Sequence, residues 1–159
     1  MQATATEDTT FAAYGAQTVH LPFGSVYTSL QTGVVDFAEN GMNVYLINRH
    51  YEVAPVISLT EHEANNAIVW ISDKLWQSLS AEQKQWVLTA AREVSLQEPK
   101  RGFELDHAAA AKLQKVGVKI VTDVDKAGFK TIADPLLDKE AKDLGPHAEK
   151  IKDLIRAIK

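Results

Sequence analysis

The sequence predicts an α/β fold, because short apolar runs typical of strands alternate along the chain with segments of helical spacing. The 159 residues are 45% hydrophobic and 24% charged, which suits a globular domain of ordinary size. One helical pattern is too long for a single compact domain, since about 36 residues would span about 54 Å. This long helix implies two lobes. Strand-like runs occur at residues 18–21, 34–35, 55–59, 66–71 and 118–121.

The first elements are short. The apolar residues Phe11–Ala13 stop at Gly15, which suits a short helix. Residues 18–21 predict a brief strand that ends at Pro22.

The stretch 24–46 is the part of the chain on which the functional interpretation depends. Ser25 can cap a helix, because its hydroxyl accepts a hydrogen bond from a free backbone N–H of the first turn. Gly33 suits the C-terminus of that helix, where a left-handed residue is favoured. Residues 34–35 predict a short buried strand, and Asp36 ends it.

A polar turn with Asp36, Glu39 and Asn40 follows this strand and leads into another helix. Strand ends in open α/β sheets leave a crevice that commonly holds a ligand. Asp36 and Glu39 could act as an acid–base pair, but their spacing across a turn favours a role in capping the next helix. An α/β enzyme that uses Asp36, Glu39 and His62 is the alternative function.

The middle of the chain carries a strand at 55–59, a polar cluster and a second strand at 66–71. His62 and Glu63 begin like the zinc motif HExxH, but Asn66 stands where the second His is needed. We therefore expect no metal site. The pair 65–66 could be a hinge between lobes or a simple turn. The three tryptophans are expected in the core.

Capping signals mark the helices that follow. Ser72 suits the start of a short helix, and Ser80 with Gln83 forms a capping box at the start of the long one. Pro99 predicts a kink or break near residue 98, because proline removes a hydrogen bond and clashes with the preceding turn.

The C-terminal part predicts one strand and two helices. The strand spans 118–121. The first helix is expected to begin at 134–135 and to end at Gly145, and Pro146 begins the second.

Composition excludes several functions. The net charge is −4 without a basic stripe, so no nucleic-acid partner is expected. The absence of cysteine excludes disulfides and thiolate chemistry. No run approaches the roughly 18 apolar residues of a membrane span. The first residues lack the pattern of a signal peptide, so the protein is expected to be cytosolic or to have lost its leader.

The run VYTSLQTGVVDFAEN at 26–40 resembles the signature of solute-binding proteins of TRAP (tripartite ATP-independent periplasmic) transporters, which typically show EVYxALQxGVVDGxEN. Further similar motifs follow in the expected order: HYEVAPVISLTEH, DKLWQSLSAEQ and KVGVKIV. The resemblance covers essentially the whole chain, but only about the second half of such a protein.

The resemblance implies an α/β fold that is half of a two-lobed periplasmic-binding-protein-like fold, with a long kinked helix spanning both lobes. It assigns 1–65 to lobe II, 66–105 to lobe I and the lobe-spanning helix, and 106–159 to lobe II with the C-terminal helices. The implied function is non-catalytic capture of a small organic acid, either a sugar acid or a dicarboxylate, in the periplasm and without a cofactor. The implied partners are the membrane subunits of a TRAP transporter.

The family's carboxylate-binding arginine would lie immediately before Met1. The resemblance therefore implies a further partner, the N-terminal half of the same protein or a swapped copy, and weak or absent ligand binding by this chain alone. A half fold would also expose strand edges and apolar surface, which favours self-association.

The resemblance also implies the ligand-binding residues. Phe23 lies where the family places an aromatic ring against the ligand, Asn40 is the ligand-bonding Asn, and His62 lies where a polar residue lines the cleft. Ser25 replaces a common Glu and Phe37 replaces the usual Gly or Ala, both beside the pocket. The alternatives are a core aromatic for Phe23, a helix N-cap for Asn40 and an ordinary polar strand end for His62.

Overall fold

The computed structural model describes residues 2–3, 7–63 and 67–158. In chain order the elements are β1 (Gln2–Ala3), α1 (Asp8–Ala13), β2 (Val19–His20), α2 (Val26–Gln31), α3 (Met42–Ile47), β3 (Val56–Ser58), α4 (Asp73–Ser78), α5 (Ala81–Lys115), β4 (Lys119–Val121), α6 (Lys126–Leu144) and α7 (Pro146–Arg156). Short 3-10 turns occupy Phe23–Ser25 and His50–Glu52.

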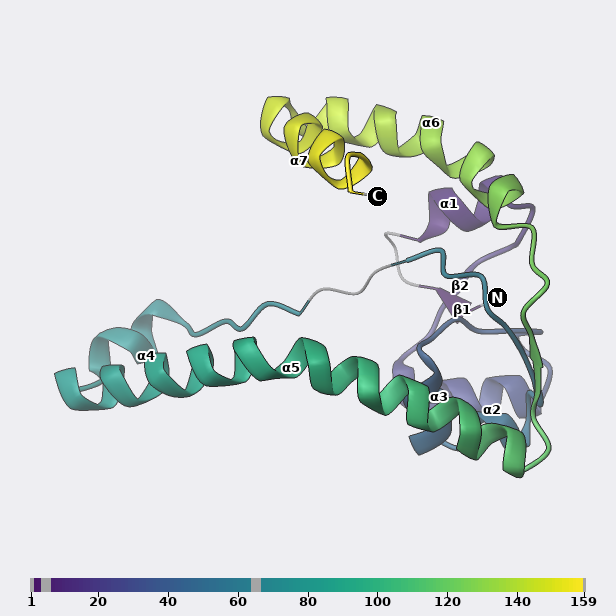
Figure 1. The fold of residues 1–159 in the computed structure, drawn as a ribbon, viewed down its shortest axis with the longest axis horizontal. Helices are drawn as coiled ribbons and strands as arrows, with labels where there is room; N and C mark the ends of the chain where they lie inside the picture. Colours follow the sequence, from purple (N-terminus) through teal and green to yellow (C-terminus); the bar gives the residue numbers. More distant parts are fainter. Residues whose placement is uncertain (1, 4–6, 64–66, 159) are drawn as a thin grey trace.

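The molecule has a body and an arm (Figure 1). The body contains α1, α2, α3, both strand pairs and the C-terminal half of α5. Helix α6 packs against α1 of the body, and α7 packs against α6. The arm, residues 67–98, consists of an extended segment, α4 and the first half of α5, and it projects away from the body. Both strand pairs are parallel: β1 lies beside β2, and β3 lies beside β4 with Ile57 opposite Ile120.

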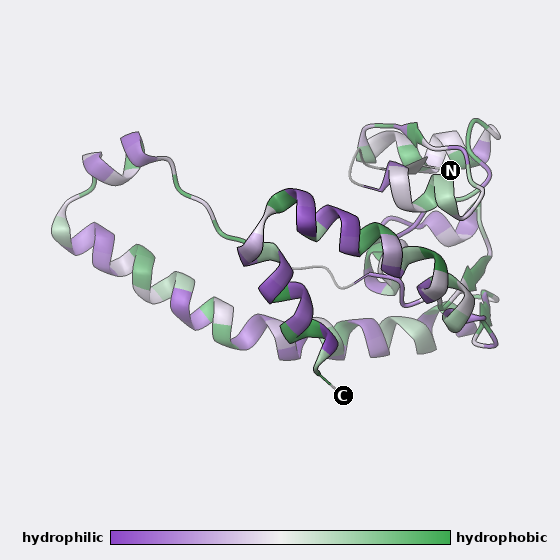
Figure 2. Ribbon diagram, turned by 90° about the horizontal axis from the view of Figure 1, so that it is seen from above, coloured by the Kyte–Doolittle hydropathy of each residue, from purple (hydrophilic) through white to green (hydrophobic). Residues whose placement is uncertain are grey.

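The hydrophobic core lies in the body. Its most buried side chains include Val26 of α2, Val35 after it, and Ala109 and Leu113 near the end of α5. Helix α3 packs against this end of α5. In the described part of the arm no residue is buried. Hydrophobic residues are nevertheless spread along the arm's half of α5 (Figure 2).

Local capping signals predicted the helix ends well. The Ser72 hydroxyl accepts from the backbone N–H of Leu75, which confirms its cap on α4. Both hydrogen bonds of the predicted box between Ser80 and Gln83 are present at the start of α5. Gly33 has a φ of 72°, the left-handed conformation expected after α2.

The predicted cap at Ser25 and the strand at 34–35 are both wrong. The hydroxyl of Ser25 makes no cap bond, because this residue belongs to a 3-10 turn whose backbone is already helical. The N–H groups of Val34 and Val35 both bond to the carbonyl of Ser29, which closes α2. These donors are therefore not available for a strand ladder. Only Val35 is buried, and Val34 is 61% exposed.

The strand predicted at 66–71 is also wrong for residues 67–71. Residues 67–71 form no strand, because no other strand of the described chain lies beside them to complete a ladder. Asn66 and the expected hinge pair 65–66 lie outside the described residues. Trp70 of this segment is 84% exposed and Trp86 is 61% exposed, so the expectation that they are core residues is wrong.

Pro99 does not break α5, and Pro135 does not begin α6. Helix α5 continues unbroken through Pro99, and its axis bends midway in both views (Figures 1 and 2). Helix α6 begins at Lys126, and Pro135 lies inside it. The earlier start follows from Asp125, whose carboxylate accepts from the backbone N–H of Gly128 at 2.9 Å.

Among the described residues no helix combines the length and the apolar character needed to cross a bilayer.

Candidate functional site

A cavity of about 420 Å³ lies in the body, where the turn after α2 meets α1, α3, β3 and α6. Its aromatic lining comes from elements far apart in sequence: Phe11, Tyr14, Phe37, Tyr45 and Phe129. Polar groups are few and are contributed by Glu39, Asn40, His50, Ser58, Thr60 and His62. An apolar wall with a few converging polar groups is typical of a small-molecule site.

Two of the four residues expected to bind ligand line this cavity. Asn40 and His62 belong to its wall, whereas Phe23 and Ser25 do not. The ring of Phe23 lies 5.9 Å from the ring of His50, which does line the cavity. Phe23 is 47% exposed, so the alternative of a core aromatic is wrong.

Asn40 is an exposed residue on the rim of the cavity. Its Oδ1 accepts from the N–H of Gly41 at 3.2 Å. Gly41 is the N-cap of α3, so the alternative of an N-cap for Asn40 is wrong. The side-chain nitrogen of Asn40 has no hydrogen-bond partner among the described residues. This amide is therefore free to bind a ligand.

The expectation that Asp36 and Glu39 cap α3 is also wrong. The carboxylate of Asp106 in α5 takes that role, because it accepts from the backbone N–H of Asn43 at 3.0 Å. A residue 63 positions away therefore satisfies the first turn of α3. Asp36 is exposed and does not line the cavity.

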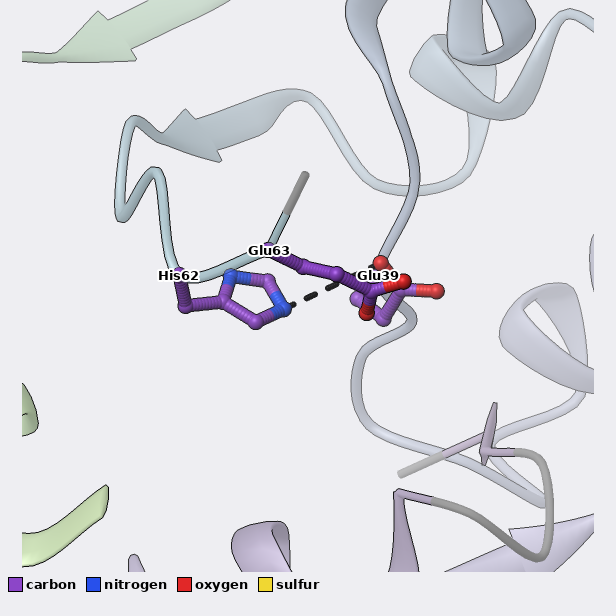
Figure 3. A group of neighbouring side chains, drawn as sticks. All are labelled: Glu39, His62 and Glu63. Carbon is purple, nitrogen blue, oxygen red and sulfur yellow. Dashed lines mark ion pairs between the residues drawn. The ribbon is translucent and has the colours of Figure 1, made fainter. Parts of the chain in front are cut away.

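His62 is held in a fixed orientation. Its Nδ1 lies 2.7 Å from the hydroxyl of Thr60, and its ring packs edge-on against Phe11 with centroids 5.4 Å apart. Its Nε2 is buried without a hydrogen-bond partner and lies 3.9 Å from the Oε2 of Glu39 (Figure 3). A buried polar atom without a partner is uncommon and marks a place where a ligand or water can bind.

Glu39 lies in an acidic environment. Burial and, to a smaller extent, the nearby carboxylates of Glu7 and Glu63 together raise the pKa of its carboxyl to about 7. Near neutral pH this side chain is therefore about half protonated, and it can donate as well as accept a hydrogen bond.

One cluster of side chains has donor atoms that could hold a metal ion: Glu39, His62 and Glu63. One donor atom from each lies within 4.8 Å of the others, and Figure 3 shows the three side chains converging. Three donors are one fewer than a structural zinc site uses, and Glu63 is exposed. The donor set alone therefore assigns no metal.

Tyr45 is the polar group that sequence reasoning missed. Its hydroxyl is buried on the cavity wall without a hydrogen-bond partner, and burial raises its pKa. Burial likewise lowers the pKa of the neighbouring His50. Tyr45 stands at helical spacing from Met42 and next to Leu46 in α3. A tyrosine among apolar residues was a usable signal, because a buried tyrosine hydroxyl usually finds a partner.

The three residues of the alternative enzyme site do not lie together. Glu39 and His62 come together, but Asp36 lies outside the cavity. The catalytic group expected from Asp36, Glu39 and His62 is therefore not assembled.

Comparison with known proteins gives a consistent result. The family model described as bacterial extracellular solute-binding protein, family 7, matches residues 1–143. A solute-binding protein of Chromohalobacter salexigens is 34% identical over 124 residues, which are 78% of this chain and 37% of that protein. The 2,3-diketo-L-gulonate-binding periplasmic protein YiaO of Escherichia coli K12 is 29% identical over 149 residues, 93% of this chain and 44% of that protein.

A solved structure shares the same fold. It is a TRAP periplasmic solute-binding protein of Xanthobacter autotrophicus Py2 with bound β-D-galacturonate, and it matches with a TM-score of 0.89 at 28% identity. The match covers 100% of this chain and 52% of that chain. The chain thus spans about half the length of the proteins it matches, or less.

Proposed function

The chain belongs to family 7 of the bacterial extracellular solute-binding proteins, and we propose that it is the cavity-bearing half of a two-lobed receptor for a sugar acid. The family consists of binding proteins rather than enzymes. The receptor works in the periplasm and delivers its ligand to the membrane subunits of a TRAP transporter.

The observation that carries this proposal is the cavity itself. Asn40, whose side-chain nitrogen is free, lines one cavity of about 420 Å³ together with Tyr45, His62 and an aromatic wall. The solved relative with the same fold holds galacturonate, and the relative from Escherichia coli is named for diketogulonate. A sugar acid is therefore favoured over a dicarboxylate.

The ligand contacts we propose are Asn40 and His62 in the cavity wall, with Phe23 and Ser25 beside it. Phe23 is exposed next to His50, and Ser25 belongs to the same 3-10 turn. This turn can contact a ligand that extends beyond the wall. Closure of a second lobe onto the ligand would favour the bound state.

The division of the chain into lobes is part of the proposal. We assign residues 1–65 and 106–159 to one lobe, and residues 66–105 to the other lobe and the connecting helix. The arm exposes a groove of about 380 Å³ lined by Val69, Trp70, Ile71, Trp76, Val87 and Leu88. Such a groove needs a cover in a soluble receptor. We propose that the N-terminal half of the same protein, or a swapped copy, covers it, since the relatives are about twice as long.

Titration of the chain with galacturonate, glucuronate and a dicarboxylate, followed by saturation-transfer NMR, tests the function. We expect weak binding of the sugar acids, at least a fivefold loss of affinity in Asn40→Ala, and no turnover. Asp36→Asn is the matched control, because Asp36 is exposed and outside the cavity. Turnover, or equal affinity in wild type and Asn40→Ala, would contradict the proposal.

A further inference from the structure

We propose that Phe37 sets which sugar acids the site accepts: its exposed ring packs against the carbon–hydrogen face of a closed sugar ring, so the site favours a pyranose acid over an open-chain sugar acid. This inference rests on the proposed function and narrows the substrate class of the same site. It is supported by the exposure of Phe37, by the packing of the other aromatic rings and by the turn that carries Phe37.

Phe37 is an exposed aromatic side chain on the cavity wall. It lines the cavity, and it is 47% exposed. Phe11 of the same wall is only 9% exposed, and Tyr14, Tyr45 and Phe129 are intermediate in burial. A ligand in the cavity that covers Phe37 removes apolar surface from water, which favours binding.

Three other rings of the wall already pack on one another. Tyr14 lies edge-on to Phe11 at 5.8 Å and to Phe129 at 4.8 Å between ring centroids. The ring of Phe37 has no aromatic neighbour within the described part of the chain. A ligand can therefore pack on Phe37 without displacing a ring contact that the fold already makes.

The turn that carries Phe37 is anchored on both sides. Before it, Val35 is buried and its N–H bonds to the carbonyl of Ser29. After it, the N–H of Gly41, the N-cap of α3, bonds to the Oδ1 of Asn40. A side chain on such a short, anchored turn loses little freedom when a ligand binds. The free amide of Asn40 lies on the same turn and can bond a hydroxyl group at the edge of the sugar ring.

A closed sugar ring suits an exposed phenyl group better than an open chain does. On the side opposite its axial hydroxyl, the pyranose ring of D-galacturonate presents a continuous carbon–hydrogen face, which can pack on an aromatic ring. An open-chain sugar acid carries hydroxyl groups along its whole length and rotates about each single bond, so it offers less apolar face and loses more freedom on binding.

Two ligands isolate the effect of the ring: D-galacturonate and L-galactonate, the open-chain acid with the same carboxylate and the same configuration at the intervening carbons. Ligand-observed NMR titration of the chain measures both affinities. We expect D-galacturonate to bind about fivefold more tightly. Phe37→Leu keeps an apolar side chain but removes the ring, so it should weaken D-galacturonate about fivefold and L-galactonate by less than about twofold.

Two further variants serve as controls. Phe37→Tyr restores the aromatic face and should keep the wild-type ratio of the two affinities. Val34→Ala changes an exposed apolar residue that follows the same helix but does not line the cavity, and it should also keep that ratio. Circular dichroism of each variant verifies that it folds.

Equal binding of the two acids by the wild-type chain would overturn the inference and leave the proposed function intact, as would an unchanged ratio in Phe37→Leu. Equal losses for both acids in Phe37→Leu would show that Phe37 supports the turn rather than recognising the sugar ring, and would also overturn the inference. Absence of binding of either acid by the wild-type chain would overturn both the inference and the proposed function.

Discussion

The carboxylate of Asp106 accepts a hydrogen bond at 3.0 Å from the backbone N–H of Asn43, across 63 positions of sequence. Asn43 lies in the first turn of α3, directly after the polar turn that carries Asn40. Asp106 lies in α5, whose other half forms the arm. One hydrogen bond therefore connects the long helix to the turn that presents Asn40 to the cavity.

Asp106→Ala should reduce the free energy of unfolding by about 1 kcal/mol, because it removes a side-chain cap from a helix N-terminus. It should also weaken sugar-acid binding, since the turn with Asn40 loses its anchor. Asp106→Asn is the matched control, because an asparagine oxygen can still accept from Asn43. Urea unfolding measures the stability of each variant. Equal losses in both variants would show that the charge matters and the cap does not.

Glu39 should make stability depend on pH. Its pKa rises from 4.5 to about 7 on folding, so its contribution is fully present below pH 4.5 and is lost as the pH rises through 7. This difference corresponds to on the order of 3 kcal/mol. Glu39→Gln, which stays neutral, should become progressively more stable than wild type between pH 4.5 and pH 8. Urea unfolding at these two pH values measures the change, and a pH-independent difference would refute it.

The arm should drive self-association of the isolated chain. Trp70 and Trp86 expose large apolar surfaces there, and the groove between the extended segment and α5 is uncovered. We expect sedimentation velocity to show a concentration-dependent oligomer, and Trp70→Lys to shift it towards monomer. Ile158→Lys, at an exposed apolar position near the C-terminus, is the control for a general charge effect. A wild-type chain that stays monomeric at all concentrations would contradict this expectation.

Local signals in the sequence predicted the ends of several helices, because a cap depends on residues a few positions apart. Ser72, Ser80 and Gln83 are examples. The strand expected at 34–35 failed because the carbonyl of Ser29 takes both backbone donors, a competition that hydrophobicity does not reveal. The start of α6 was placed too late because Pro135 was given more weight than the cap at Asp125.

The site was only partly predictable from the sequence, because several of its residues come from elements that are far apart in the chain. Asn40 was identified from a contiguous motif, and the structure places it on the cavity rim. The roles of Tyr45 and Phe129 depend on which elements meet in three dimensions, and no short sequence window contains that information. Asp106 was missed as the cap of α3 because it lies 63 residues from its partner.

We propose that the turn with Asn40 offers its side-chain amide to a sugar acid in the cavity. NMR spectra of the ¹⁵N-labelled chain during titration with D-galacturonate test this contact. We expect the side-chain amide signals of Asn40 to shift and saturate, together with backbone signals of Tyr45 and His62. Signals that stay fixed at these three residues while others shift, for example in the arm, would contradict it.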